Sequence, residues 1–234
     1  MAEPVAKEPA GRIALVAGSS GLIGQHLLDV LLDAPEYQRV FALSRRPLDR
    51  DHPRLANRIV QFDKLEAQLK GLVCQDAFCC LGTTMAQARS EAALRQVDLD
   101  YVVNFARAAL AARAERLVVI SSVGAAVDAK VFYLRVKGEM EAALARLGIV
   151  SLDILQPGLL LGSRRELRPA EFLARWLMPI ANPFLVGARE PYRGIAARTV
   201  AAAMLGAARS GRRGVYRYTY AGICALAQRR SRVV

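Results

Sequence analysis

The sequence predicts an α/β protein with a doubly wound parallel sheet, on three observations. Short apolar runs rich in branched residues, such as residues 13–17 and 116–120, have the composition of buried parallel strands. Amphipathic helical patterns separate these runs, so that strands and helices alternate along the chain. The first run ends in three glycines spaced three residues apart, and a helical pattern follows at once. A strand, a glycine-rich turn and a helix in this order are typical of a Rossmann-type sheet with a nucleotide-binding turn.

The glycine-rich turn is the first candidate site. It consists of Gly18, Ser19, Ser20, Gly21, Leu22, Ile23 and Gly24. Gly18 allows a tight exit from the strand, Gly21 lets backbone N–H groups approach a pyrophosphate, and Gly24 lets the helix lie close to the strand. The first turn of the helix adds unpaired N–H groups and the positive end of its dipole. The spacing G-x-x-G-x-x-G differs from the commoner G-x-G-x-x-G, so the prediction also depends on the flanking strand and helix.

The end of the second strand, residues 39–43, indicates which cofactor the chain binds. The strand ends at Ser44, Arg45 and Arg46, where a protein that binds NAD usually carries an acidic residue for the ribose 2′-hydroxyl. Guanidinium groups in place of a carboxylate suit a 2′-phosphate, because arginine can bind it through two hydrogen bonds. The sequence therefore favours NADP(H) over NAD(H). An ordinary basic loop is the alternative that these residues leave open.

Further candidate residues follow the later strands of the predicted sheet. We expect strands at residues 59–63, 77–81, 116–120, 151–156 and 215–218, and helices at residues 97–113, 133–147, 196–208 and 221–230. Ligands bind such sheets at the carboxyl ends of the strands, which makes Leu81, Gly82 and Thr83 candidate cofactor contacts, and likewise Pro157. Asp63, which ends the third strand, either contacts the adenine or caps the next helix, and capping is the favoured role.

A second candidate site combines two serines with a tyrosine and a lysine. Ser121 and Ser122 end the fifth strand, and Tyr133 and Lys137 stand at the start of the following helix. Tyrosine and lysine four residues apart share one helical face, so the ammonium can lie near the phenol. The spacing is common by chance. It matters here because it follows a strand ending in serines, in a chain with a nucleotide-binding turn.

Composition limits the class of protein and its partners. The chain has 234 residues, enough for a sizeable core, and a formal net charge of +12 that favours anionic ligands. We expect no specific nucleic acid, because the arginines are scattered and no basic helix or RNA-binding aromatic motif is present. No disulfide or metal site is expected from the four cysteines and two histidines. Without an apolar signal segment or a run long enough to span a membrane, the chain is expected to be cytoplasmic.

The chain divides into three expected parts. Residues 1–11 form a flexible leader, and residues 12–158 form the NAD(P)-binding core. Residues 159–234 are punctuated by proline and glycine, so we expect a small substrate or lid region packed on the core, with a basic tail. A helix is expected over residues 170–177 and carries the only tryptophan, Trp176.

The glycine-rich turn, the serine pair and the Tyr-x-x-x-Lys pair together resemble the short-chain dehydrogenase/reductase superfamily, of the extended or atypical type. A closer similarity comes from three segments and from the Pro-Gly pair at residues 157–158. The segments are Phe78-Cys79-Cys80-Leu81-Gly82-Thr83-Thr84, Val97-Asp98-x-Asp100-Tyr101 and Tyr133-Leu134-x-Val136-Lys137-Gly138-Glu139. They resemble the Tat-interacting-protein oxidoreductase subgroup and its bacterial relatives. This resemblance covers roughly residues 12–214.

The resemblance implies roles for the second candidate site. Tyr133 would be the catalytic acid or base, Lys137 would hold the nicotinamide ribose and keep the phenol acidic, and Ser122 or Ser121 would orient a carbonyl. A nearby cation favours the phenolate and so brings a phenol with an ordinary pKa of about 10 towards neutral pH. The family pattern has arginine before Pro-Gly, whereas this chain has Gln156, which removes one anchoring charge near the site.

These features predict an NAD(P)-binding oxidoreductase that uses NADPH to transfer a hydride to a small carbonyl substrate, with an alcohol as the substrate of the reverse reaction. We expect a monomer or a homodimer. The alternative is an NADPH-sensing regulatory or interaction protein with little or no catalysis.

Overall fold

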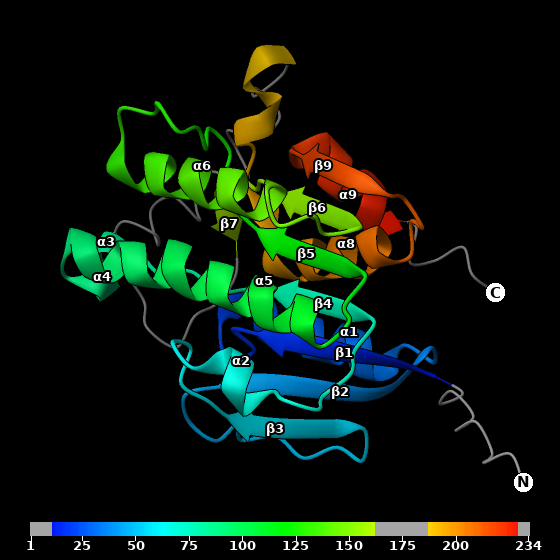
Figure 1. Ribbon diagram of the computed structural model, residues 1–234. Coiled ribbons are helices and arrows are strands. Elements are labelled where there is room, and N and C mark those ends of the chain that lie inside the picture. The colour runs from blue at the N-terminus through cyan, green and yellow to red at the C-terminus, as the bar shows by residue number, and fades with distance from the viewer. Residues whose placement is uncertain (1–10, 162–186, 229–234) are drawn as a thin grey trace, which may run out of the picture.

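The computed structural model describes residues 11–161 and 187–228. Its centre is a seven-stranded sheet in the order β3-β2-β1-β4-β5-β6-β9, and every neighbouring pair is parallel (Figure 1). The strands of this sheet are β1 (Arg12–Ala17), β2 (Tyr37–Ser44), β3 (Leu55–Ile59), β4 (Asp76–Cys79), β5 (Arg116–Ile120), β6 (Ser151–Leu155) and β9 (Gly214–Tyr218). A second sheet pairs β7 (Leu160–Leu161) with β8 (Ile195–Ala196). The predicted Rossmann-type fold is confirmed.

Helices cover both faces of the main sheet (Figure 1). One face carries α2 (Leu65–Gln68), α5 (Tyr101–Ala111) and α6 (Phe132–Ala145), and the other carries α1 (Leu22–Asp33), α8 (Ala197–Ala208) and α9 (Tyr220–Gln228). The chain reaches α5 through α3 (Met85–Ala88), α4 (Glu91–Arg95) and a π-helical turn, η1 (Gln96–Asp100). A 3-10 helix, η3 (Gly187–Tyr192), precedes β8.

Alternate residues of the central strands pack against opposite helical layers. In β1, Leu15 and Ala17 belong to the cluster that includes α5 and α6. Ala14 and Val16 belong to the cluster that includes α1 and α8. Because both faces are buried, every position of the strand favours an apolar residue, and this explains the continuous apolar run in the sequence.

The strand order reverses at the junction of β1 and β4, which is the point where ligands bind in doubly wound sheets. The glycine-rich turn follows β1, and the segment with Leu81, Gly82 and Thr83 follows β4. The serine pair follows β5, and the Pro-Gly pair comes soon after the end of β6. Because the strands are parallel, the topology brings these candidate segments to one edge, the carboxyl edge of the sheet.

The third strand differs from the prediction. It was expected over residues 59–63 and instead forms β3, Leu55–Ile59, at the edge of the sheet. Val60 and Phe62 suggested a strand by their alternation, but both are buried in the coil that follows β3. Phe62 packs there against the ring of Tyr101, with the ring centroids 5.7 Å apart. An edge strand is only partly buried, so β3 lacks the apolar pattern that identified the central strands.

The capping role favoured for Asp63 is wrong. Its side chain is exposed, and α2 begins after Lys64 without a side-chain capping bond. A backbone turn, in which the N–H of Lys64 donates to Gln61, already leads the chain into this short helix. The helix expected over residues 97–113 starts earlier, because α4 and η1 run directly into α5.

The domain boundary at residue 158 stays a prediction. Beyond it, β9 pairs with β6 in the main sheet, and α8 packs against α1. Much of the described C-terminal part therefore belongs to the same sheet and layers as the core. The leader up to residue 10, the helix expected over residues 170–177 with Trp176, and the end of the basic tail lie outside the described residues.

Candidate functional site

The glycine-rich turn passes close to the end of β4. Gly18 has a φ of +78°, and a Cβ atom on it would lie 2.6 Å from the carbonyl group of Cys80. A Cβ atom on Gly24 would overlap the carbonyl oxygen of Gly18, so the absence of a side chain lets α1 approach the turn. The N–H of Gly21 donates to the same oxygen over 3.0 Å. The turn thus has the tight exit and the close helix approach that the spacing predicts.

The start of α1 has the features that a dinucleotide phosphate requires. The N-cap residue, Gly21, offers no side-chain cap, and the first turn carries no acidic residue. The hydroxyl of Ser19 is buried and has no hydrogen-bond partner among the described residues. A buried hydroxyl without a partner costs free energy that a ligand atom can recover. This unpaired donor and the uncapped helix N-terminus fit the pyrophosphate of a bound NAD(P).

The three residues at the end of β2 have separate roles. Ser44 is buried, donates to the carbonyl of Arg46 over 2.6 Å, and accepts from Asn57 over 2.7 Å. It therefore shapes the turn. Arg45 and Arg46 are exposed, and within the described residues neither guanidinium has an ion pair. Two unpaired cations thus lie one strand away from the glycine-rich turn, at the same edge of the sheet.

The other expected cofactor contacts are spread along this edge. Leu81 is half-buried and Gly82 exposed, while the N–H of Thr83 donates to a buried carboxylate described below. Pro157 is buried, and its carbonyl accepts from the N–H that follows the serine pair, which ties the ends of β5 and β6 together. Asp63 is exposed beyond the edge strand and makes no hydrogen bond or ion pair with the other candidates among the described residues.

Tyr133 and Lys137 come together on α6 as the resemblance implies. The Lys137 ammonium lies 6.0 Å from the centroid of the Tyr133 ring. Lys137 is 1% exposed, whereas Tyr133 is half-buried and accessible from solvent. The ammonium donates to the carbonyl of Ile120 over 3.3 Å, directly before the serine pair. The phenol, the ammonium and the end of β5 therefore form one cluster.

A buried carboxylate that the sequence analysis did not select completes this cluster. The Oδ1 atom of Asp98 lies 2.9 Å from the Nζ atom of Lys137, and its Oδ2 atom accepts from the N–H of Thr83 over 2.8 Å. Burial lowers the pKa of Lys137, but the charge and hydrogen bond of Asp98, together with the nearby Tyr133 and Cys79, raise it by more, so the pKa stands above its ordinary value. The helical spacing in the sequence could have revealed Asp98. It lies four residues from both Leu94 and Val102, which are buried, so an ionisable group shares their apolar face.

The two serines point to different partners. Ser121 is buried and donates to Oε1 of Glu141 over 2.6 Å. Glu141 also accepts from Gln156 over 2.8 Å and from Arg217 over 2.7 Å. Gln156 therefore does not leave the site without an anchoring charge, because Arg217 on β9 supplies the cation. Among the described residues, the half-buried Ser122 makes only a 3.4 Å contact with the carbonyl of Val123, so its hydroxyl is the more available of the two.

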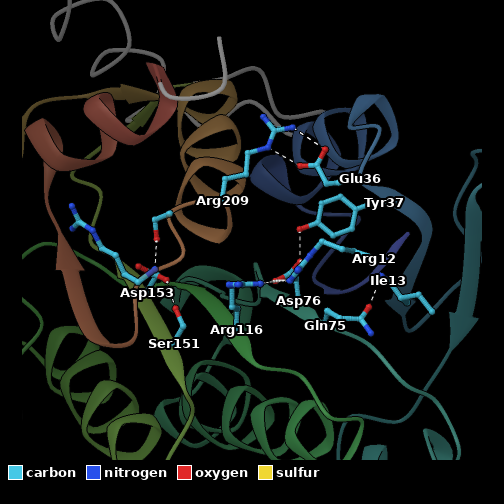
Figure 2. A network of polar contacts seen from close by, with 12 residues as sticks. Arg12, Ile13, Glu36, Tyr37, Gln75, Asp76, Arg116, Ser151, Asp153 and Arg209 are labelled. Atoms are coloured by element: carbon cyan, nitrogen blue, oxygen red, sulfur yellow. Dashed lines mark hydrogen bonds and ion pairs between the residues drawn. The ribbon is translucent and has the colours of Figure 1, made fainter. Parts of the chain in front are cut away.

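A surface cavity of about 640 Å³ lies at the opposite, amino edge of the sheet. Its charged lining includes Arg12, Glu36, Arg116 and Arg209 (Figure 2). These side chains are engaged within the protein: Arg209 pairs with Glu36, and Arg12 with Asp76. None of the candidate residues lines this cavity, and the size of the cavity alone does not make it the candidate site.

Comparison with known proteins identifies the family. A model described as the NAD dependent epimerase/dehydratase family matches residues 14–128. Protein HTATIP2 of Rattus norvegicus is 37% identical over 164 residues, which are 68% of this chain and 67% of that protein. The chain belongs to the HTATIP2-like subgroup of the short-chain dehydrogenase/reductase superfamily. Protein fmp52-1, mitochondrial, of Aspergillus terreus belongs to the same set of relatives, with 33% identity over 77% of this chain and 80% of its own. The resemblance stated from the sequence is confirmed, and the chain is a member of an NAD(P)-binding family.

Solved structures agree on the fold. MoeE5 in complex with UDP-glucose and NAD superimposes with a TM-score of 0.65 at 20% identity, covering 88% of this chain and 75% of that one. The UDP-glucose 4-epimerase of Thermotoga maritima, solved with UDP-glucose, gives a TM-score of 0.67 at 15% identity over 92% and 80%. At such identities the likeness shows the Rossmann-type fold and does not extend to substrate.

The expectation of a cytoplasmic protein is contradicted. Relatives from Aspergillus terreus, Emericella nidulans and Candida glabrata carry the word mitochondrial in their names. The expectation rested on the lack of an apolar signal segment, but segments that direct proteins to mitochondria are amphipathic and arginine-rich, so that criterion does not detect them. In the part of the chain that the structure describes, no helix has both the length and the apolar character needed to cross a bilayer.

Proposed function

We propose that this chain is an NADPH-dependent oxidoreductase that transfers a hydride to the carbonyl carbon of a small substrate. One observation carries the proposal: a buried, charged Lys137 lies 6.0 Å from the ring of a solvent-accessible Tyr133. This pair lies at the same sheet edge as the glycine-rich turn. A proton donor near a fixed cation, beside a dinucleotide-binding turn, is what carbonyl reduction requires.

Each residue has a part in the proposed reaction. Tyr133 donates its phenol proton to the substrate oxygen as the carbonyl carbon is reduced, and the Lys137 charge favours the phenolate that remains. Bound NADPH would supply the hydride. Lys137 would also hold the nicotinamide ribose. Ser122 would orient the carbonyl by donating a hydrogen bond, because the hydroxyl of Ser121 already donates to Glu141.

The preference for NADPH depends on Arg45 and Arg46. They are exposed and unpaired in the described residues, and no acidic residue stands with them at the end of β2. Free guanidinium groups there support binding of a 2′-phosphate. Ser19 and the N-terminus of α1 would hold the pyrophosphate, with Gly82 and Thr83 beside the rest of the dinucleotide.

The proposed acid role is tested by Tyr133→Phe. The variant keeps the ring and loses the proton, so turnover on a carbonyl panel should fall by about 10²- to 10⁴-fold, while NADPH affinity stays within a few-fold. Steady-state kinetics and titration of NADPH fluorescence measure the two effects. Tyr216→Phe is the matched control, because the hydroxyl of the half-buried Tyr216 donates, among the described residues, only to the nearby carbonyl of Arg213.

The same experiment separates the two functions that the sequence left open. Turnover by Tyr133→Phe at the wild-type rate would remove Tyr133 from the mechanism. A wild-type protein that binds NADPH and reduces nothing in the panel would instead favour the NADPH-sensing alternative, which pull-downs with and without NADPH would then examine.

The cofactor preference is tested by Arg45→Glu. Loss of a charged hydrogen bond to the 2′-phosphate, together with a new repulsion, should weaken NADPH binding by roughly 10- to 100-fold and change NADH binding little. Paired fluorescence titrations with the two cofactors give the ratio. Arg107→Glu makes the same change of charge on α5, at an exposed position, and should leave both affinities unchanged. Equal weakening of NADPH and NADH by Arg45→Glu would refute the role in phosphate binding.

A further inference from the structure

We propose that Asp98 is a positioning residue that keeps the buried Lys137 side chain charged and holds it beneath the loop after β4. The proposal deepens the proposed function and rests on it for its catalytic meaning, because that function needs a cationic lysine beside Tyr133. The fixed charge itself can be measured without any substrate.

The geometry assigns two tasks to one carboxylate. Its Oδ1 atom lies 2.9 Å from the Lys137 Nζ atom, and its Oδ2 atom accepts from the backbone of Thr83 over 2.8 Å. Asp98 is 0% exposed and Lys137 is 1% exposed. One aspartate in η1 therefore connects the lysine of α6 to the loop that follows β4. Movement of either partner would change the position of the other.

Gly82 explains how a buried ion pair can act on a ligand at the sheet edge. Gly82 is exposed, and a Cβ atom on it would lie 3.4 Å from Oδ1 of Asp98 and 3.8 Å from Nζ of Lys137. Only a backbone without a side chain thus separates the pair from the surface. A ligand that lies along this loop therefore comes close to both members of the ion pair.

Three titratable groups face the ammonium. They are Asp98 from η1, Tyr133 from α6 itself and Cys79 from the end of β4. Burial raises the pKa of the Cys79 thiol to about 12, so this thiol stays neutral. Tyr133 is neutral while it holds its proton. Asp98 is therefore the standing negative charge that faces Lys137 among the described residues.

Without the Asp98 charge, burial would determine whether Lys137 is protonated. Burial disfavours the ammonium, so an uncompensated Lys137 would release its proton at a lower pH. A neutral amine no longer favours the phenolate of Tyr133. The pair thus stabilises the charged form of a lysine that water cannot reach.

The decisive measurement is the titration of Lys137 itself. The chain has five lysines among its 33 basic residues, so a ¹³C-lysine spectrum is simple, and Lys→Arg changes at the other four assign Lys137 by elimination. In the wild-type protein without cofactor, Lys137 should titrate above the ordinary lysine value of about 10.4. In Asp98→Asn it should titrate at least about one unit lower. Titration of the wild-type lysine below its ordinary value, or an unchanged titration in Asp98→Asn, would overturn the proposal.

Control variants keep the test decisive. Asp100→Asn makes the same chemical change two residues away, at an exposed position of η1, and should not move the titration. Asp98→Glu keeps the carboxylate and should retain most of the raised titration. If Asp98→Asn does not fold, the wild-type titration and Asp98→Glu still decide the question. A normal Lys137 titration in Asp98→Glu, with the fold intact, would show that the carboxylate is not the cause.

A second readout links the charge to the site. NADPH affinity of Asp98→Asn should fall as the pH is raised from about 6.5 through the lowered titration of Lys137, beyond any change in wild type over the same range, and should recover at the lower pH. A purely structural defect would not recover on acidification. Failure of the wild-type protein to bind NADPH would count against the proposed function, whereas the titration of Lys137 would still stand.

Discussion

Two buried aspartates near opposite edges of one sheet differ in how completely they are paired. Asp76 begins β4 at the amino edge, and its carboxylate accepts from Arg12 over 2.6 and 2.7 Å (Figure 2). It also accepts from the hydroxyl of Tyr37 over 2.7 Å. Arg116 lies 3.3 Å away and adds a second guanidinium. The starts of β1, β2, β4 and β5 therefore meet at one saturated carboxylate.

Asp98, near the carboxyl edge, has fewer donors. It faces Lys137 and the N–H of Thr83, and its Oδ1 atom accepts no well-aligned hydrogen bond in the described residues. Because donors from three other strands surround the Asp76 carboxylate, this cluster holds the strands in register. The Lys137 ammonium has three donor hydrogens and, among the described residues, contacts Asp98 and the Ile120 carbonyl, so one donor remains for a ligand. The comparison assigns the first aspartate to the fold and the second to the candidate site.

The largest expected effect on stability comes from Asp76→Ala. Removal of the carboxylate leaves Arg12, Arg116 and Tyr37 without their acceptor. Breaking a buried pair costs about 3–5 kcal/mol, and partial exposure of both guanidinium groups puts the expected loss at about 2–3 kcal/mol of unfolding free energy. Urea denaturation measures this loss, and the NADPH affinity of the folded protein should not change.

The matched control for this variant is Asp29→Ala. Asp29 pairs with Arg50 on the surface, where it is 54% exposed, and its loss should cost well under about 1 kcal/mol. Equal destabilisation by the two variants would break the comparison, and so would an Asp76→Ala protein that is stable but unable to bind NADPH.

A smaller effect is expected from Tyr37→Phe. Burial raises the pKa of the Tyr37 phenol far above its ordinary value, so the hydroxyl stays a donor to Asp76. Its removal takes one of several donors from a charged acceptor and should cost about 1–2 kcal/mol. Thermal unfolding against Tyr216→Phe as a neutral control checks this value. A loss as large as that of Asp76→Ala would mean that the two arginines contribute little.

The sequence was sufficient for the buried strands and for the local motifs. The strands β1, β5 and β6 lie where continuous apolar runs predict them, because strands covered on both faces need apolar residues throughout. The edge strand β3 was misplaced, since an edge strand has no such run. The glycine-rich turn and the Tyr-x-x-x-Lys pair were visible because each lies within one short segment of chain.

Partners that are distant in sequence were not visible. Arg217 reaches Glu141 across 76 positions, and this contact supplies the charge that Gln156 was expected to remove. The pair of Asp98 and Lys137 joins η1 to α6, and no pattern of spacing links the two segments. The sequence also did not show which of the two serines already has a hydrogen-bond partner, because Glu141, which accepts from Ser121, lies 20 residues further along the chain.

By itself, the sequence determined the Rossmann-type sheet, its glycine-rich turn and the placing of Tyr133 and Lys137 on one helical face, because periodicity and turn geometry are properties of neighbouring residues. Only the tertiary structure decided the electrostatics of the site. Parallel strands bring distant segments to one edge, and the state of a buried charge depends on whichever group the fold puts beside it. For Lys137 that group is Asp98, at 2.9 Å.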